Sequence, residues 1–125
     1  MDNQKVFAME FARVYPLLVT KAQRKGRTAQ EVEQVTCWLT GYTPADLLRA
    51  QQDGTSYGDF FRNAPAPNPC RDQIKGTVCG VRVENIEDPL MREIRYLDKL
   101  VDELAKGKPM EKILRTAPRR KITPF

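Results

Sequence analysis

The absence of histidine is the first informative feature of this 125-residue sequence. Histidine is the side chain that most often serves as a general base near neutral pH, and it is the commonest nitrogen ligand of zinc. Catalysis by a Ser-His-Asp triad or a Cys-His pair is therefore excluded. The remaining residues form no other recognisable catalytic constellation, and we predict no catalytic residue, no metal site and no cofactor.

Cysteine is scarce as well, with Cys37, Cys70 and Cys79 and no C-x-x-C pair. Three cysteines cannot form a complete disulfide framework, so we expect free thiols in a reducing cytoplasm. Cys79 is the only candidate nucleophile, because Lys75 and Arg82 would lie near it on a helix and would lower its pKa. The alternative is that each cysteine is a small buried hydrophobic residue.

Long apolar runs are also missing. No stretch approaches the roughly 20 apolar residues that a membrane-spanning helix needs. The first residues, Met1 to Lys5, lack the basic and then apolar pattern of a signal peptide. We therefore expect a cytoplasmic protein without a membrane span, with a single helical domain over residues 1–115 and a basic, disordered tail over residues 116–125.

The net charge of +5 is unevenly distributed. Residues 108–125 contain six basic residues and one acidic residue, which accounts for the whole excess. Residues 1–107 are therefore neutral overall. The basic composition indicates a charged tail rather than a charged face, and it is weak support for a nucleic-acid-binding surface.

One segment, residues 88–107, has every feature of an amphipathic helix. Asp88 is a suitable N-cap, and Pro89 suits the first helical position because its missing N–H would be unpaired there. Gly107 is a typical C-terminal stop. The apolar residues share one face, which is more typical of a core than of an interface; they are Leu90, Ile94, Leu97, Val101 and Leu104.

Similar signals predict a mainly α fold, a compact bundle of five to seven short helices. Pro16 interrupts an apolar segment and predicts a helix over 16–25. Thr28 with Glu31 has the capping-box pattern, and Thr43-Pro44 opens a further helix. Two short helices are also expected at residues 56–62 and 109–115.

Residues 70–86 are ambiguous. Cys79, Val81 and Val83 alternate with polar residues and glycine, as in a strand. Ile74, Val78 and Val81 also fit one face of a helix. We favour a helix, and minor β structure over residues 77–84 remains the alternative.

Residues 33–52 resemble a helix-turn-helix, with small Cys37 before Gly41 and Leu47 after it. Nucleic-acid binding is thus one hypothesis. Against it, the second helix carries Asp46, Arg49 and Asp53, a net charge of −1, where a basic surface is expected. An ordinary helical hairpin is favoured. The candidate phosphate contacts are Lys21, Arg24, Lys25, Arg27, Arg49, Arg119, Arg120 and Lys121.

A small-molecule site is a further hypothesis, in which exposed Trp38 and Tyr42 mark a pocket with Arg82. The polar residues that we expect on the outer face of the 88–107 helix complete the candidate binding set. They are Arg92, Arg95 and Tyr96.

Several strings of this sequence resemble those of the bacterial domain-of-unknown-function 2200 family. They are residues 11–16, 25–28, 38–42, 78–84 and 86–107, and the resemblance covers roughly residues 5–115. It implies a small bacterial cytoplasmic protein and supplies no activity, catalytic residue or binding residue. Our leading hypothesis is a non-enzymatic protein that acts by protein–protein interaction or self-association as a homodimer. The apolar stripe of the long helix motivates this hypothesis.

Overall fold

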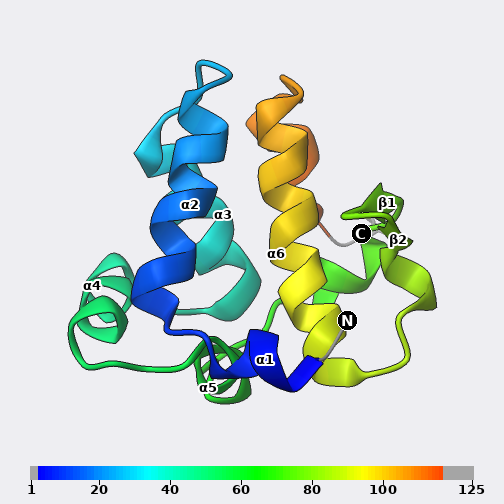
Figure 1. The fold of residues 1–125 in the computed structure, drawn as a ribbon. Helices are drawn as coiled ribbons and strands as arrows, with labels where there is room; N and C mark the ends of the chain where they lie inside the picture. The colour runs from blue at the N-terminus through cyan, green and yellow to red at the C-terminus, as the bar shows by residue number, and fades with distance from the viewer. Residues whose placement is uncertain (1–2, 117–125) are drawn as a thin grey trace, which may run out of the picture.

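The computed structural model describes residues 3–116, which fold into a bundle of seven α-helices with one small β-hairpin (Figure 1). This confirms the predicted mainly α bundle. The α-helices are α1 (Asn3–Ala8), α2 (Phe11–Gln23), α3 (Ala29–Thr40), α4 (Pro44–Gln52), α5 (Tyr57–Arg62), α6 (Pro89–Ala105) and α7 (Met110–Ile113). The other elements are the 3-10 helices η1 (Pro69–Gln73) and η2 (Val83–Asn85) and the strands β1 (Thr77–Val78) and β2 (Val81–Arg82).

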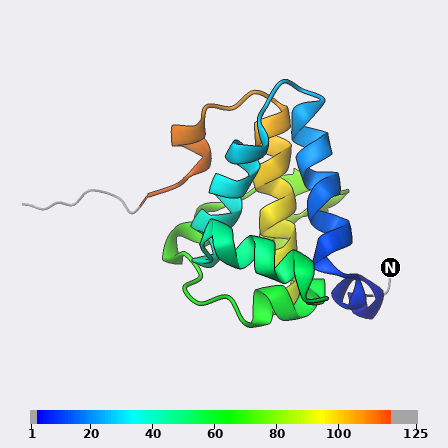
Figure 2. The same ribbon diagram turned by 90° about the vertical axis from the view of Figure 1, so that its left-hand side faces the viewer.

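Helix α6 is the centre of the bundle. It packs against α2 and α3 along its length, against α5 near its start, and against β1 and η2 on another side. Figure 1 shows α2 and α6 side by side with α3 behind them, and Figure 2 shows the same three helices as one layered core. Helices α1, α4 and α5 close one end of this core, and the hairpin covers α6 on the side away from α2.

The predicted ends of α6 are confirmed. The Asp88 carboxylate accepts hydrogen bonds from the Leu90 and Met91 N–H groups at 2.9 and 3.1 Å. Gly107 has φ 87° and ends the helix in the left-handed conformation. The apolar face is buried by the chain's own helices, and Leu97, Val101 and Leu104 are each 0% exposed. The stripe is therefore core, and it does not provide a free interface.

The predicted start of the second helix at Pro16 is wrong. Helix α2 begins at Phe11, and Pro16 lies inside it on an exposed position. A proline there removes one backbone hydrogen bond and costs about 3 kcal/mol. Burial of Phe11 and Tyr15 offsets this cost, and Phe11 stacks on Phe60 with ring centroids 4.0 Å apart. Tertiary packing thus overrides the local signal.

The favoured helix over residues 70–86 is also wrong, and the alternative of minor β structure within 77–84 is confirmed. The deciding feature is the turn between the strands. Cys79 and Gly80 have φ of 52° and 81°, the pair of positive values that a two-residue type I′ turn requires. This backbone twist matches that of two antiparallel strands, so β1 and β2 pair directly across the turn.

The other helix starts agree with the sequence. Thr28 and Glu31 form the predicted capping box, and Thr43 caps α4 with Pro44 in the first turn. None of the helices within residues 3–116 is long and apolar enough to cross a membrane. The predicted disordered tail lies, apart from Thr116, outside the described residues.

Candidate ligand-binding cavity

A mainly apolar cavity of about 330 Å³ opens where α1, α2, α5, α6 and the hairpin turn meet. We call it the α1–α6 cavity. Its volume lies at the lower end of the range for small-molecule sites in proteins. Its apolar walls are formed by Val6, Met9, Val14 and Ile94, and its polar lining by Tyr57, Cys79, Arg95 and Asp98.

The junction between α1 and α2 is fixed to the start of α5 by backbone hydrogen bonds. The Tyr57 N–H donates to the Met9 carbonyl oxygen at 2.6 Å, and the Phe11 N–H donates to the Thr55 carbonyl oxygen at 2.9 Å. Glu10 and Ser56 form an isolated β-bridge between the same two segments. These contacts fix the start of α5, which carries Tyr57, against the junction of α1 and α2, which carries Met9.

Tyr57 is the most unusual residue of the cavity lining, because its hydroxyl oxygen is fully buried. The residue is 2% exposed, and its ring packs edge-on against Phe61 at a centroid distance of 5.2 Å. Among the described residues, the hydroxyl oxygen has no hydrogen-bond partner. Burial raises the pKa of Tyr57 well above its ordinary value, and the nearby Asp98 carboxylate adds to this effect. A buried hydroxyl without a partner costs about 1–3 kcal/mol.

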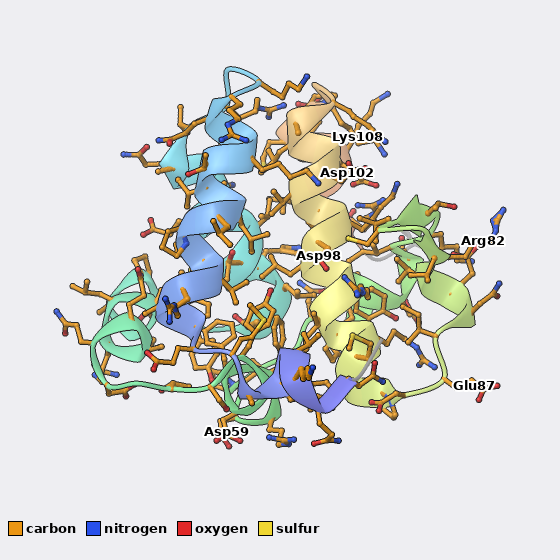
Figure 3. All side chains as sticks on the ribbon, in the orientation of Figure 1. Asp59, Arg82, Glu87, Asp98, Asp102 and Lys108 are labelled. Atoms are coloured by element: carbon orange, nitrogen blue, oxygen red, sulfur yellow. The ribbon has the colours of Figure 1, made fainter. Side chains whose placement is uncertain are left out.

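Arg95 and Asp98 form an ion pair in the wall contributed by α6. Arg95 Nη1 donates to Asp98 Oδ2 at 2.9 Å, and the side chains are only 18% and 16% exposed. Burial raises the pKa of Asp98 above its ordinary value, while the hydrogen bond and charge of Arg95 oppose this rise. Figure 3 shows Asp98 about halfway along α6. Asp98 belongs to the cavity lining.

Cys79 brings a thiol to the same place from the hairpin turn. Its Sγ lies 4.0 Å from Asp98 Oδ2. The cavity thus joins apolar walls to a hydroxyl, an ion pair and a thiol that converge at one end. Among these groups Tyr57 and Asp98 have shifted pKa values, and groups with shifted pKa values in an apolar pocket are typical of ligand sites. Within residues 3–116, no group of three or more carboxylate or cysteine side chains is arranged to hold a metal ion.

Trp38, Tyr42 and Arg82 are not brought together. Trp38 and Tyr42 are half-buried and pack against the core. Tyr42 also lines a small hollow of about 160 Å³ beside α4, and neither Trp38 nor Arg82 belongs to its lining. The Tyr42 hydroxyl donates to the Phe60 carbonyl oxygen at 2.7 Å. Arg82 is exposed on β2 and lies 3.4 Å from Glu84. Strand β2 and helix α3 are on different sides of α6 in Figures 1 and 2, and Arg82 points away from the bundle in Figure 3.

The predicted outer face of α6 is largely covered. Tyr96, expected to be exposed, is 6% exposed. Arg92 donates from Nε and Nη2 to the Ile86 carbonyl oxygen at 2.9 and 2.6 Å. The segment from η1 to η2 packs over this face, and Lys99 Nζ donates to the Thr77 carbonyl oxygen at 3.2 Å. Of the predicted binding residues on α6, only Arg95 lines the α1–α6 cavity.

Several predicted phosphate contacts are engaged within the fold. Lys21 lies 3.5 Å from Asp102, Arg49 lies 2.9 Å from Asp46, and Arg27 lies 2.8 Å from Glu31. Arg24 and Lys25 are exposed. The remaining three candidates lie outside the described residues; they are Arg119, Arg120 and Lys121. Nucleic-acid binding stays a prediction.

Tyr57 and Asp98 were missed by reasoning from the sequence. Tyr57 fits the pattern of an ordinary core aromatic, and nothing in its neighbourhood predicts an unpaired hydroxyl. Asp98 offers a weak signal, because it follows Arg95 by three residues and both flank the apolar stripe. Nothing in the sequence predicts which element lies opposite this pair.

Two comparisons place the chain among known proteins. The profile of a family described as "Uncharacterized protein conserved in bacteria (DUF2200)" matches residues 5–115. The chain belongs to this family. A solved structure described as "Crystal structure of uncharacterized protein SP1917" resembles this DUF2200 chain with a TM-score of 0.86 and 54% sequence identity, and the match covers 91% of this chain and 93% of that chain. No curated protein matches the chain. The DUF2200 resemblance noted in the sequence is therefore confirmed.

Proposed function

We propose that this DUF2200 protein is a non-enzymatic binding protein whose ligand is a small, mainly apolar molecule with one hydrogen-bonding end, held in the α1–α6 cavity. The observation that carries this proposal is Tyr57, which lines the cavity and whose buried hydroxyl has no partner among the described residues. A ligand atom that bonds this hydroxyl would recover the free energy that its burial costs, about 1–3 kcal/mol.

The neighbouring polar groups support recognition of such a ligand. A tyrosine hydroxyl both donates and accepts, a carboxylate accepts, and a guanidinium has five N–H donors. Arg95 uses Nη1 to hold Asp98, and other N–H groups of the same guanidinium can serve a ligand. A ligand that covers these groups would displace water from them, which would strengthen each of these hydrogen bonds.

A screen of small aromatic and aliphatic amides, alcohols and carboxylates by thermal shift tests the proposal. Compounds that stabilise the full chain should bind the Tyr57→Phe variant about tenfold more weakly, since one hydrogen bond is lost. Tyr42→Phe is the matched control, because its hydroxyl bonds the Phe60 carbonyl oxygen outside the cavity. Equal affinity for the wild type and Tyr57→Phe would contradict the proposed site.

Self-association is a second candidate, supported by a different surface from the one first expected. Met9 and Leu17 are 44% and 65% exposed and line a hollow of about 600 Å³ that shares Met9 with the α1–α6 cavity. Exposed apolar side chains around a hollow are typical of interaction surfaces. Sedimentation velocity should show a dimer that Leu17→Arg weakens. A monomer at all concentrations would reject this candidate.

A further inference from the structure

The fold gathers positive charge at one end of the bundle, where α2 and α6 finish side by side (Figure 1). Residues 21–31 and 102–116 make up this region, which we call the basic end. They include eight basic and four acidic residues, a net charge of +4. The other described residues include ten basic and eleven acidic residues, a net charge of −1. Both segments contribute to the excess, so folding creates a charged face in addition to the basic tail predicted from the sequence.

Arg27 joins the two segments of the basic end. Its Nη1 donates to the Lys108 carbonyl oxygen at 2.8 Å. This contact fixes the segment that carries Arg24 and Lys25 against the segment that carries Lys106 and Lys108. Arg24 and Lys25 are exposed, and the side chains of Lys106 and Lys108 are 71% and 40% exposed. Figure 3 shows Lys108 at the end of α6. Four accessible cations therefore belong to one junction, which the Arg27 guanidinium holds together.

The carboxylates of the basic end do not neutralise these cations. Asp102 is shared, since it lies 3.5 Å from Lys21 Nζ and 3.0 Å from Lys106 Nζ. Neither Arg24 nor Lys25 has an ion-pair partner within residues 3–116. The C-terminal ends of α2 and α6 carry partial negative charges that together amount to about −1. This is smaller than the net charge of +4, so the helix ends leave most of the excess in place.

The composition of the basic end favours phosphate groups over a protein or a membrane. The large apolar side chains that are exposed within residues 3–116 lie elsewhere; they are Met9, Leu17, Leu48 and Val81. A protein interface has an apolar centre from which lysine is depleted, and a helix that lies on a membrane needs an apolar face. The basic end also contains no aromatic residue on which the bases of a single strand would stack. The backbone of a duplex requires only cations.

From this arrangement we infer that the basic end binds the phosphate backbone of a double-stranded nucleic acid without sequence specificity. The residues that contact phosphates are Arg24, Lys25, Lys106 and Lys108. No helix enters a groove, so this interface differs from the helix-turn-helix hypothesis for residues 33–52. Phosphate contacts position a protein on a duplex but do not read its sequence. The inference is independent of the proposed function, because no residue that lines the α1–α6 cavity belongs to the basic end.

Fluorescence anisotropy of the full chain with short labelled DNA and RNA duplexes, measured over a range of salt concentrations, tests the inference. The double variants Arg24→Gln/Lys25→Gln and Lys106→Gln/Lys108→Gln should each lower the slope of log K against log salt by about 2, because each phosphate contact contributes about 0.9. Arg13→Gln/Lys75→Gln is the matched control. It removes the same charge from exposed positions outside the basic end and should leave the slope nearly unchanged. Circular dichroism checks that each variant is folded.

The outcomes separate the basic end from net charge and from the tail. Salt-dependent binding of either duplex that both variants of the basic end weaken would support the inference, and the tighter duplex identifies the source of the phosphates. The absence of such binding, or an equal loss in the matched control, would overturn it. A loss confined to the full-length variant Arg119→Gln/Arg120→Gln/Lys121→Gln would also overturn it, because the tail would then be responsible. Polyglutamate that competes as well as a duplex would assign the surface to acidic protein segments instead.

Discussion

The Arg27 guanidinium donates a hydrogen bond of 2.8 Å from Nη1 to the carbonyl oxygen of Lys108. The same nitrogen donates to the Leu104 carbonyl oxygen at 3.2 Å, and the Glu31 carboxylate holds the other side of the group. Arg27 thus bonds the Leu104 carbonyl in the last turn of α6, which also accepts from the Gly107 N–H, and the Lys108 carbonyl just beyond the helix. A residue that the charge pattern suggested for phosphate contact instead ties the loop before α3 to the end of α6.

Replacing Arg27 by glutamine should lower the free energy of unfolding by about 1.5–3 kcal/mol, because hydrogen bonds from a charged donor are lost. Urea denaturation measures this change. Arg24→Gln is the matched control, since Arg24 is exposed and lies three residues before Arg27 at the end of α2. If both variants lose the same stability, the capping role is wrong.

Arg115 should contribute to stability through a buried carboxylate. Its Nη1 and Nη2 donate to Glu103 at 2.7 and 2.8 Å, and Glu103 is 5% exposed. Arg115→Gln leaves that carboxylate poorly compensated and should cost about 3 kcal/mol. Lys112→Gln, at an exposed position of α7, should cost little.

A chain that ends at Thr116 should unfold like the full chain, which would support the predicted boundary of the helical domain.

Cys79→Asn should stabilise the hairpin. It creates an Asn-Gly pair at a type I′ turn, and a gain of about 0.5–1 kcal/mol is expected. Cys79→Ala should give no gain, because alanine keeps the positive φ without the tolerance of asparagine for it. Equal unfolding free energies for the wild type and Cys79→Asn would show that the turn stores no strain.

Asp98 should keep its proton to a higher pH than an ordinary aspartate, because burial raises its pKa. An NMR titration of side-chain carboxyl groups measures this directly. Asp46 provides the contrast, since hydrogen bonds from Thr43 and Arg49 lower its pKa. Arg95→Gln should raise the Asp98 pKa further. An Asp98 that titrates below Asp46 would contradict the described burial.

The sign of the resulting pH dependence follows from the raised pKa. The folded chain binds a proton at Asp98 more tightly than the unfolded chain does. Its contribution to stability is therefore fully present below the unfolded pKa, about 3.9, and is lost as pH rises through the folded pKa. Asp98→Asn should remove this part of the pH dependence.

The helix boundaries were predictable where a local signal coincided with packing. Asp88, Thr28 and Thr43 each cap a helix that the sequence predicts. The helix start predicted at Pro16 was wrong, because the burial of Phe11 and Tyr15 outweighs one lost backbone hydrogen bond. The helix predicted over residues 70–86 was wrong because strand alternation and helical spacing fit the same apolar residues. The positive φ at Cys79, which decides the matter, belongs to a residue type that rarely adopts it.

The candidate site was less predictable than the fold. Arg95 was selected as a polar residue of the long helix, and Cys79 was selected for its nearby cations. Arg95 and Cys79 line the same cavity because the hairpin packs back onto α6, and local sequence patterns do not predict that packing. Tyr57 lines the cavity from α5 and is far away in sequence from Arg95. The lack of a partner for the Tyr57 hydroxyl depends on how all these elements pack together, so the sequence could not predict it.

Methyl-detected NMR of the full chain, titrated with compounds that stabilise it, tests the central claim most directly. The account predicts that a bound compound shifts the resonances of Met9, Val14 and Ile94, which line the α1–α6 cavity. Val32 and Val35, buried in α3 and outside the cavity lining, should stay unchanged. Tyr57→Phe should weaken the titration. Shifts confined to other surfaces, or binding that ignores Tyr57, would contradict the claim that this cavity is the ligand site.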